Sequence, residues 1–238
     1  MTRPPYRLRI FLFLVCVLVA VFVLDAASQA IRTFERLDIV ERSRDRWQRP
    51  ADILAPLNLK EGSKVAEIGS GAGYFALKLA PLVGTRGSVF AVDILKEPLG
   101  FLWIRARLRH ERQLHVILGE PDDPHLPMQG IDAVLIANTY HEFTNPQAMG
   151  DHVIQALRPG GRLVVADRGP GPGGEAVNEA EAREHHERSP EAVERELLAE
   201  GFELVSRQDG FVFSSPLEHA GDRPELHPWW LIVVRKPY

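Results

Sequence analysis

The sequence predicts an α/β fold in which helices cover both faces of a mostly parallel sheet. Three observations support this prediction. A strand, a glycine turn and a helix follow one another in residues 65–80, short apolar runs alternate with helical patterns further along the chain, and residues 131–137 are apolar almost throughout. A strand that is buried on both faces of a parallel sheet has this near-continuous apolar character, and alternating strands and helices are typical of such sheets.

The turn within residues 65–80 contains glycine at three alternate positions, Gly69, Gly71 and Gly73, with Ser70 between the first two. Glycine lets the backbone turn tightly and approach a ligand closely. Unpaired N–H groups in the first turn of the following helix attract a negatively charged ligand group. We therefore expect these residues to bind a ligand through free amides, and we expect the helix to end at Pro81.

An acidic residue, Asp93, follows the apolar strand predicted at residues 88–92. In dinucleotide-binding folds an acid at this place accepts hydrogen bonds from ribose hydroxyls. The dinucleotide fingerprint would also place a small residue at position 74, where this chain has Tyr74. The spacing therefore differs from that of a dinucleotide site.

The spacing Gly-x-Gly-x-Gly, with Glu67 two residues ahead, resembles the first motif of the class I, Rossmann-like methyltransferases that depend on S-adenosylmethionine. Further segments match in order, at residues 89–94, 131–138 and 157–167, and the resemblance covers roughly residues 50–206. The resemblance implies a Rossmann-like, mostly parallel seven-stranded sheet with helices on both faces, an antiparallel final strand and S-adenosyl-L-methionine as the cofactor.

The resemblance also implies roles for individual residues. Glu67 and the glycine turn would position the methionine end of the cofactor, and Asp93 would bind the ribose. The acidic loop after the third strand would bind the adenine amine, with Glu120 and Asp122 as candidates. Asn138 completes the predicted cofactor site. We predict no metal site, because the adjacent His185 and His186 would not share a helix face and no ligand cluster accompanies them.

The segment after residues 131–137 follows the carboxyl end of the predicted central strand, where open α/β sheets bind ligands. Tyr140, His141 and Glu142 are therefore expected to face the methyl acceptor. His141 is the candidate general base, because the ordinary pKa of histidine lies close to working pH. Glu142 is the second catalytic candidate, which would orient or replace that base. A structural role for His141, in which it fixes the loop, is the alternative.

Residues 10–24 form an unbroken apolar run of 15 residues, with Arg3, Arg7 and Arg9 before it. The run predicts either an uncleaved anchor, which reaches spanning length over residues 8–27, or a signal peptide cleaved after a site such as Ser28-x-Ala30. We therefore divide the chain into residues 1–30 as anchor or signal, 31–49 as an amphipathic connecting helix and 50–238 as the methyltransferase domain. Residues 47–50 resemble entrance helices that cover cofactor sites, although simple packing of Trp47 is an equal alternative.

The composition limits the acceptor. The chain of 238 residues has a net charge of −4, which argues against a broad basic face for nucleic acid. Cys16 is its only cysteine, so the chain cannot form an intrachain disulfide. We expect a small-molecule or lipid-like acceptor, and a charge-rich lid at residues 175–188. We expect the catalytic domain on the cytoplasmic side of a membrane, with export after signal cleavage as the alternative.

Two other functions remain open at this point, and they belong to different classes. One is a dinucleotide-dependent oxidoreductase, against which Tyr74 and the later motifs argue. The other is a tethered module that binds the cofactor without catalysis.

Overall fold

The computed structural model describes residues 6–169, 188–213 and 228–238. The predicted lid lies outside these residues except for Arg188, and so do His185 and His186. The chain divides into two compact units, Met1–Arg46 and Trp47–Tyr238.

The described residues of the first unit belong to a single long helix, α1 (Tyr6–Gln48), whose last two residues fall in the second unit. The helix passes without a break through both the apolar run and the amphipathic stretch, where the sequence predicted two segments. The large apolar side chains that are described between Ile10 and Leu24 are exposed. Among the described residues, no helix combines the length and the apolar character that crossing a membrane requires.

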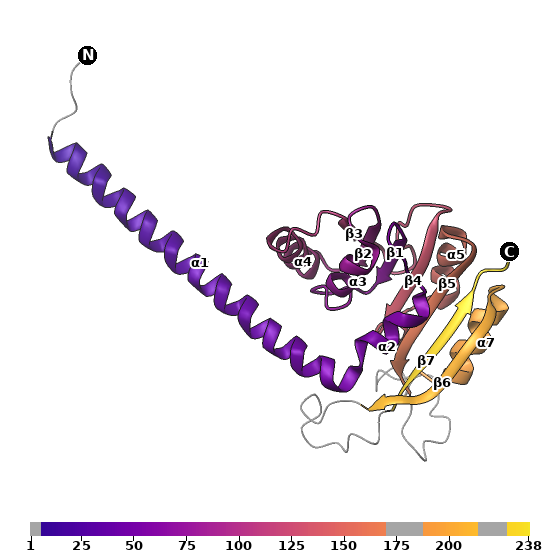
Figure 1. Ribbon diagram of the computed structural model, residues 1–238. Helices are drawn as coiled ribbons and strands as arrows, with labels where there is room; N and C mark the ends of the chain where they lie inside the picture. The colour runs from indigo at the N-terminus through magenta and orange to yellow at the C-terminus, as the bar shows by residue number, and fades with distance from the viewer. Residues whose placement is uncertain (1–5, 170–187, 214–227) are drawn as a thin grey trace. The chain divides into compact units, whose positions relative to one another are not determined.

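Seven strands of the second unit form one sheet in the order β3-β2-β1-β4-β5-β7-β6 (Figure 1). The strands are β1 (Lys64–Ile68), β2 (Ser88–Asp93), β3 (Leu114–Leu118), β4 (Ile131–Ala137), β5 (Leu157–Arg168), β6 (Glu203–Phe213) and β7 (Pro228–Arg235). The first five strands pair in parallel, and β7 pairs antiparallel with both β5 and β6. The predicted seven-stranded, mostly parallel sheet with an antiparallel final strand is confirmed.

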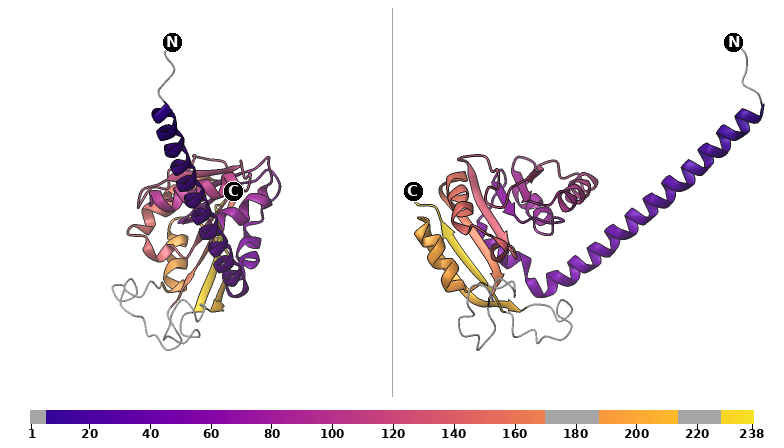
Figure 2. Two further views of the ribbon diagram at one scale, coloured as in Figure 1. Left: turned by 90° about the vertical axis from the view of Figure 1, so that its left-hand side faces the viewer. Right: turned by 180° about the vertical axis from the view of Figure 1, so that it is seen from behind.

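Helices cover both faces of this sheet, as predicted. One face packs against α2 (Pro50–Leu54), the short helix η1 (Ala55–Leu57), α3 (Ala76–Val83) and α4 (Lys96–Leu108). The other face packs against η2 (Tyr140–Glu142), α5 (Pro146–Ala156) and α7 (Pro190–Ala199). Figure 2 shows α7 beside β6 and β7, at the edge of the sheet opposite α4.

The central strand β4 divides the apolar core into two layers. Leu135 belongs to the core on the α3 side, and its neighbours Val134 and Ile136 belong to the core on the α5 side. Successive side chains of a strand point to opposite faces, so a strand covered on both faces is apolar at nearly every position, and in β4 only Asp132, near its start, is not. Fully burying one such side chain stabilises the fold by ~1.5–3 kcal/mol.

Two predicted helix ends are wrong. Pro81 lies inside α3, which continues to Val83, because Pro81 removes only its own N–H donor and Gly84 still donates to the carbonyl of Ala80 at 3.2 Å. Residues 159–161, a proline followed by two glycines, have a sequence that predicts the end of the helix before them, α5 (Pro146–Ala156), but they lie within β5 instead. There the Gly160 N–H donates to the carbonyl of Lys236 at 2.9 Å.

Asn145 and Ser189 each stand directly before a proline, a pattern that predicts the start of a helix, and a helix follows each of them. Asn145 caps α5, since its Oδ1 accepts a hydrogen bond from the Ala148 N–H at 3.2 Å. Ser189 precedes α7 as expected, but its hydroxyl donates to Glu191 Oε2 at 2.6 Å and forms no side-chain cap.

Glu200 directly follows α7, and its carboxyl group packs against Gly150 of α5. A Cβ atom added at Gly150 would overlap this carboxyl group. Within the described residues, Glu200 Oε2 is buried and has no hydrogen-bond partner. Burial, together with the charges of Asp151 and Glu196, raises the pKa of Glu200 to about 8. The helix pair is therefore most stable when this carboxyl group is protonated.

We predict that Glu200→Gln stabilises the protein at alkaline pH. The folded-state pKa of about 8 lies above the ordinary value of 4.5, so the wild type loses stability as pH rises from about 4.5 through 8. The amide keeps the neutral shape, so the variant should melt about 2–8 °C higher than the wild type at pH 8.5. At pH 5 the difference should be small. Thermal unfolding at both pH values is the measurement, and the exposed Glu97→Gln is the control.

Candidate functional site

A cavity of about 420 Å³ lies at the carboxyl ends of β1, β2, β3 and β4. The strand order reverses between β1 and β4, and open α/β sheets bind ligands at such a switch point. The volume is that of a small-molecule site. Five predicted site residues line the cavity: Gly69, Asp93, Glu120, Asn138 and Glu142.

The other predicted residues do not line this cavity. Glu67 is buried within β1, and Ser70 is buried in the turn. Gly71 and Gly73 continue the turn, and Asp122 is exposed in the acidic loop. Of the two acids proposed for the adenine, the structure therefore brings only Glu120 to the cavity wall.

The turn after β1 holds itself together through its own amides, which differs from the prediction of free amides. The N–H groups of Gly69 and Ser70 both donate to the carbonyl of Val92 at 2.9 Å, and the Gly73 N–H donates to the carbonyl of Ser70 at 2.8 Å. The Gly71 N–H donates to Asp93 Oδ2 at 2.8 Å. These four donors are satisfied by the protein because β1 and β2 end side by side.

Two of the three glycines are required by packing within the protein. An added Cβ atom at Gly69 would overlap the Thr139 side chain, and one at Gly73 would overlap Leu102 of α4. Gly71 differs, because nothing lies within 4 Å of an added Cβ atom there, although its φ of +49° favours glycine. At Gly69 and Gly73 the absence of a side chain is thus needed by the protein's own packing, and the approach of a ligand to the three glycines stays a prediction.

Asp93 joins the turn to the loop after β2. Its Oδ2 accepts from the Gly71 N–H, and its Oδ1 accepts from the Leu95 N–H at 2.9 Å. Each carboxylate oxygen has a second lone pair, so Asp93 can accept further hydrogen bonds from a ligand in the cavity.

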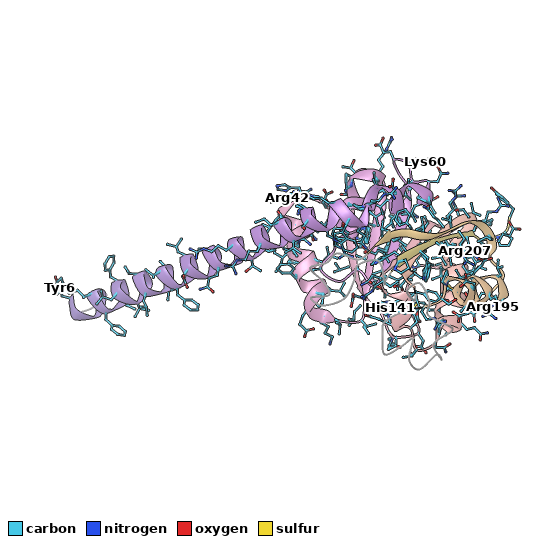
Figure 3. All side chains as sticks on the ribbon, turned by 90° about the horizontal axis from the view of Figure 1, so that it is seen from below. Tyr6, Arg42, Lys60, His141, Arg195 and Arg207 are labelled. Carbon is cyan, nitrogen blue, oxygen red and sulfur yellow. The ribbon has the colours of Figure 1, made fainter. Side chains whose placement is uncertain are left out.

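His141 is buried next to the cavity wall, and its side chain is 2% exposed (Figure 3). The His141 Nδ1 lies 2.8 Å from Asp167 Oδ1, and the backbone N–H of His141 donates to Asp167 Oδ2 at 3.0 Å. On the other side, Nε2 lies 3.7 Å from Glu142 Oε1. Because a carboxylate can only accept, Asp167 selects the tautomer with the proton on Nδ1.

The order of these groups from the cavity inward is Glu142, His141, Asp167. The Glu142 side chain is 60% exposed and lines the cavity, whereas the Asp167 side chain is fully buried. The sequence had placed His141 at the acceptor with Glu142 beside it. The structure instead places Glu142 at the wall and His141 behind it.

Asp167 is the residue that sequence reasoning missed. It was assigned only as the end of the fifth strand, yet it also accepts a hydrogen bond from the Arg168 N–H at 2.8 Å. The available signal was an acid directly after the apolar run of residues 163–166, because a charge that ends a buried strand needs partners.

Tyr140 does not reach the cavity, although the sequence placed it on the acceptor side. Its ring is buried, and its hydroxyl donates to Glu196 Oε2 at 2.9 Å. Burial first, and then the charge of Glu196, raise the pKa of this hydroxyl.

Trp47, in the segment predicted to cover the cofactor site, packs edge-on against Trp229 with ring centroids 6.0 Å apart. Residues 47–50 do not line the cavity.

A family model described as a methyltransferase domain matches residues 59–209, which is more than half of the chain. The chain belongs to this methyltransferase family. This family agrees with the predicted class of enzyme, an S-adenosylmethionine-dependent methyltransferase, and with its predicted cofactor.

Individual relatives of the methyltransferase are distant. Protein-L-isoaspartate O-methyltransferase of Methanothrix thermoacetophila is 31% identical over 109 residues, which is 46% of this chain and 49% of the relative. The chain thus spans about half the length of the curated relatives that it matches.

Solved structures establish the fold of the methyltransferase. A SAM-dependent methyltransferase from Aquifex aeolicus aligns with a TM-score of 0.62 at 20% identity, over 78% of this chain and 88% of the other. Phosphoethanolamine N-methyltransferase 2 from Haemonchus contortus, solved with S-adenosyl-L-methionine, aligns with a TM-score of 0.64 at 17% identity, over 81% and 53%.

The residues of the methyltransferase fit S-adenosylmethionine. Asn138 lines the cavity, and its buried Oδ1 has no hydrogen-bond partner within the described part of the chain. Buried polar atoms normally have partners, so this one fits a polar ligand in the cavity. Asp93 would bind the ribose and Glu120 the adenine amine. S-adenosylmethionine supplies an electrophilic methyl group to the acceptor.

We predict that Asp93→Ala weakens S-adenosylhomocysteine binding by about one to two decades, because a hydrogen bond to a charged group contributes ~1.5–3 kcal/mol. Glu120→Ala should also weaken binding. Asp122→Ala should leave binding unchanged, because Asp122 lies outside the cavity wall. Isothermal titration calorimetry measures all three.

Asp122→Ala is the matched control, since it removes an exposed acid from the same loop as Glu120. Unchanged affinity in both Asp93→Ala and Glu120→Ala would contradict the cofactor assignment. Thermal unfolding separates lost affinity from a lost fold, because Asp93→Ala also removes the acceptor for Gly71 and Leu95.

Proposed function

We propose that the protein transfers the methyl group of S-adenosylmethionine to an acceptor that binds in the cavity at the carboxyl ends of β1 to β4. One observation carries this proposal. Four residues from separate stretches of the sequence, Gly69, Asp93, Glu120 and Asn138, form walls of the same cavity. Membership of the methyltransferase family supports the same activity.

The main task of the chain in this reaction is positioning. Methyl transfer is an in-line displacement that requires no nucleophilic side chain, and correct alignment of the two reactants can contribute ~7–11 kcal/mol. Gly69 of the turn that is fixed by Asp93 lines the cavity, and Asn138, Thr139 and Glu142 of the loop after β4 line it as well.

Glu142 is the residue that we propose to take a proton from the acceptor. Its carboxylate lines the cavity, and it lies 3.7 Å from His141 Nε2, the nitrogen that carries no proton in the tautomer selected by Asp167. When the acceptor takes the methyl group, the bond from the methyl carbon to the donor sulfur would break and release S-adenosylhomocysteine, and Glu142 would take the proton that leaves the acceptor atom. His141, held by Asp167, fixes this side of the cavity and can share that proton through Nε2.

We favour a small-molecule or lipid-like acceptor. The mouth of the cavity carries two large exposed apolar side chains, Ile94 at 54% and Leu95 at 55% exposure. Phe143 and Met149 add apolar surface to the cavity lining. An apolar acceptor gains free energy by covering such surface.

An isoaspartyl carboxylate on a protein is the second candidate acceptor. The relative from Methanothrix thermoacetophila is a protein-L-isoaspartate O-methyltransferase, and other matching relatives have the same name. A carboxylate acceptor is already ionised at neutral pH and has no proton to lose. Methylation of such an acceptor would not need Glu142 as a base.

We predict that Glu142→Gln lowers turnover about 10²- to 10⁴-fold if the acceptor carries a proton, because general-base help typically has this magnitude. The affinity for S-adenosylhomocysteine should stay within about threefold, since proton removal comes after the cofactor has bound. His141→Ala should lower turnover and also destabilise the fold, because it leaves the buried Asp167 carboxylate without its side-chain partner.

Turnover and S-adenosylhomocysteine affinity are measured in parallel, and Asp122→Asn is the control that removes an exposed acid outside the cavity. If turnover falls less than about threefold in Glu142→Gln, no base is needed and an ionised acceptor is favoured. If affinity falls as much as turnover, Glu142 binds the cofactor and the proposed role in proton transfer is wrong.

The test of the activity itself begins with titrations of S-adenosylmethionine, S-adenosylhomocysteine and NAD. Binding of NAD, without binding of either S-adenosyl compound, would favour the alternative of a dinucleotide-dependent oxidoreductase. The family match does not support this alternative. Methyl transfer from labelled donor is then measured with an isoaspartyl peptide and with a lipid extract. Binding of S-adenosylmethionine without transfer to either one would favour the module without catalysis.

We also propose that the protein associates with a membrane through residues 8–27, with the catalytic domain on the cytoplasmic side where the donor is made. The unbroken apolar run and the exposure of its described side chains support this proposal. Membrane fractionation, protease protection in intact cells and N-terminal sequencing test it. A cleaved product outside the cell would support export instead.

A further inference from the structure

Helix α4 carries exposed apolar side chains beside an arginine on its outer face. Trp103 is 50% exposed, Ile104 43% and Leu108 63%. The guanidinium carbon of Arg107 lies 5.4 Å from the centre of the Trp103 ring. We call Trp103, Ile104, Arg107 and Leu108 the α4 face. Its apolar members are unusual, because the same helix already buries a separate set: Leu99, Leu102 and Ala106.

The charges around the α4 face are mainly positive. Exposed basic side chains lie on the helix and in the turn that follows it: Lys96, Arg107, Arg109 and Arg112. The acids in the same stretch are Glu97 and Glu111. This local excess of positive charge contrasts with the net charge of −4 for the whole chain. It complements an anionic surface.

The loop that leads into α4 forms part of the cavity mouth. Ile94 and Leu95 are exposed, line the cavity and directly precede the helix. The chain segment that carries the α4 face thus follows directly on two exposed residues of the cavity lining.

We propose that the α4 face docks on the surface of an anionic lipid membrane. A helix that presents tryptophan and aliphatic side chains with arginines around them has the composition of an interfacial helix. The apolar side chains would enter the boundary between headgroups and acyl chains, and the arginines would meet the anionic headgroups. The apolar run of residues 10–24 in the same chain favours a lipid surface over a protein partner.

Docking in this way would set the mouth of the cavity against the bilayer. An apolar acceptor could then pass along Ile94 and Leu95 into the cavity without crossing water. This second step rests on the proposed methyl transfer to a lipid-like acceptor. The docking itself does not.

The test uses the full chain reconstituted in vesicles that contain phosphatidylglycerol. Cys16, the only cysteine, is first removed by the substitution Cys16→Ser. A polarity-sensitive fluorophore is then attached to the cysteine introduced by Ile104→Cys. The matched control is Leu198→Cys on α7, because Leu198 is 41% exposed and Ile104 is 43% exposed. Lipids that carry a nitroxide on the acyl chain quench a fluorophore only where it enters the bilayer.

The expected result is strong quenching at position 104 and little quenching at position 198. Replacing Arg107 and Arg109 by glutamine should weaken the docking equilibrium about fivefold for each arginine, and uncharged phosphatidylcholine vesicles should weaken it further. Trp103→Ser should weaken it about tenfold or more. These variants should leave S-adenosylhomocysteine affinity unchanged.

Equal quenching at the two positions, or none at either, would overturn the proposal. The fluorophore at position 104 could instead become buried in the absence of lipid, to an extent that increases with protein concentration. This result would identify a second copy of the chain as the occupant of the α4 face and would also overturn the proposal. Docking is read without turnover, so its failure is distinct from failure of the proposed activity, which S-adenosylmethionine binding and methyl transfer test separately.

Discussion

The hydrogen bond between the Gly71 N–H and Asp93 is the contact on which the cofactor cavity depends. It joins the turn after β1 to the end of β2, and the Leu95 N–H on the other carboxylate oxygen extends the connection to the mouth. Both strands end at the same edge because they pair in parallel and in register. One carboxylate thus organises backbone from two loops before any ligand is present, which reduces the ordering cost of binding.

The fold could be predicted because its strongest signals are local. The continuous apolar run of β4 and the glycine turn after β1 depend on neighbours in the sequence. Helix ends were harder to predict, because a proline near the end of a helix removes only its own N–H donor. The residues after it can still form helical hydrogen bonds, as the N–H of Gly84 does beyond Pro81. The pairing of residues 159–161 with the end of the chain is a tertiary contact that local patterns do not contain.

The site was predictable only in part for a similar reason. Asp93, Glu120 and Asn138 follow strand ends, so topology brings them to one cavity. The contact between His141 and Asp167 depends instead on how β4 and β5 align across 26 residues of sequence. The fold also leaves the acceptor undefined, since its solved neighbours include a phosphoethanolamine N-methyltransferase and its curated relatives act on isoaspartyl proteins.

The half-buried Glu200 complicates any pH–rate profile of this enzyme. Its ionisation near pH 8 would loosen the contact between α5 and α7, and α7 also carries Glu196, which binds the Tyr140 hydroxyl next to His141. A decline in rate on the alkaline side would then report helix packing as well as chemistry. Assigning that limb of the profile to a catalytic base therefore requires an enzyme in which position 200 cannot ionise.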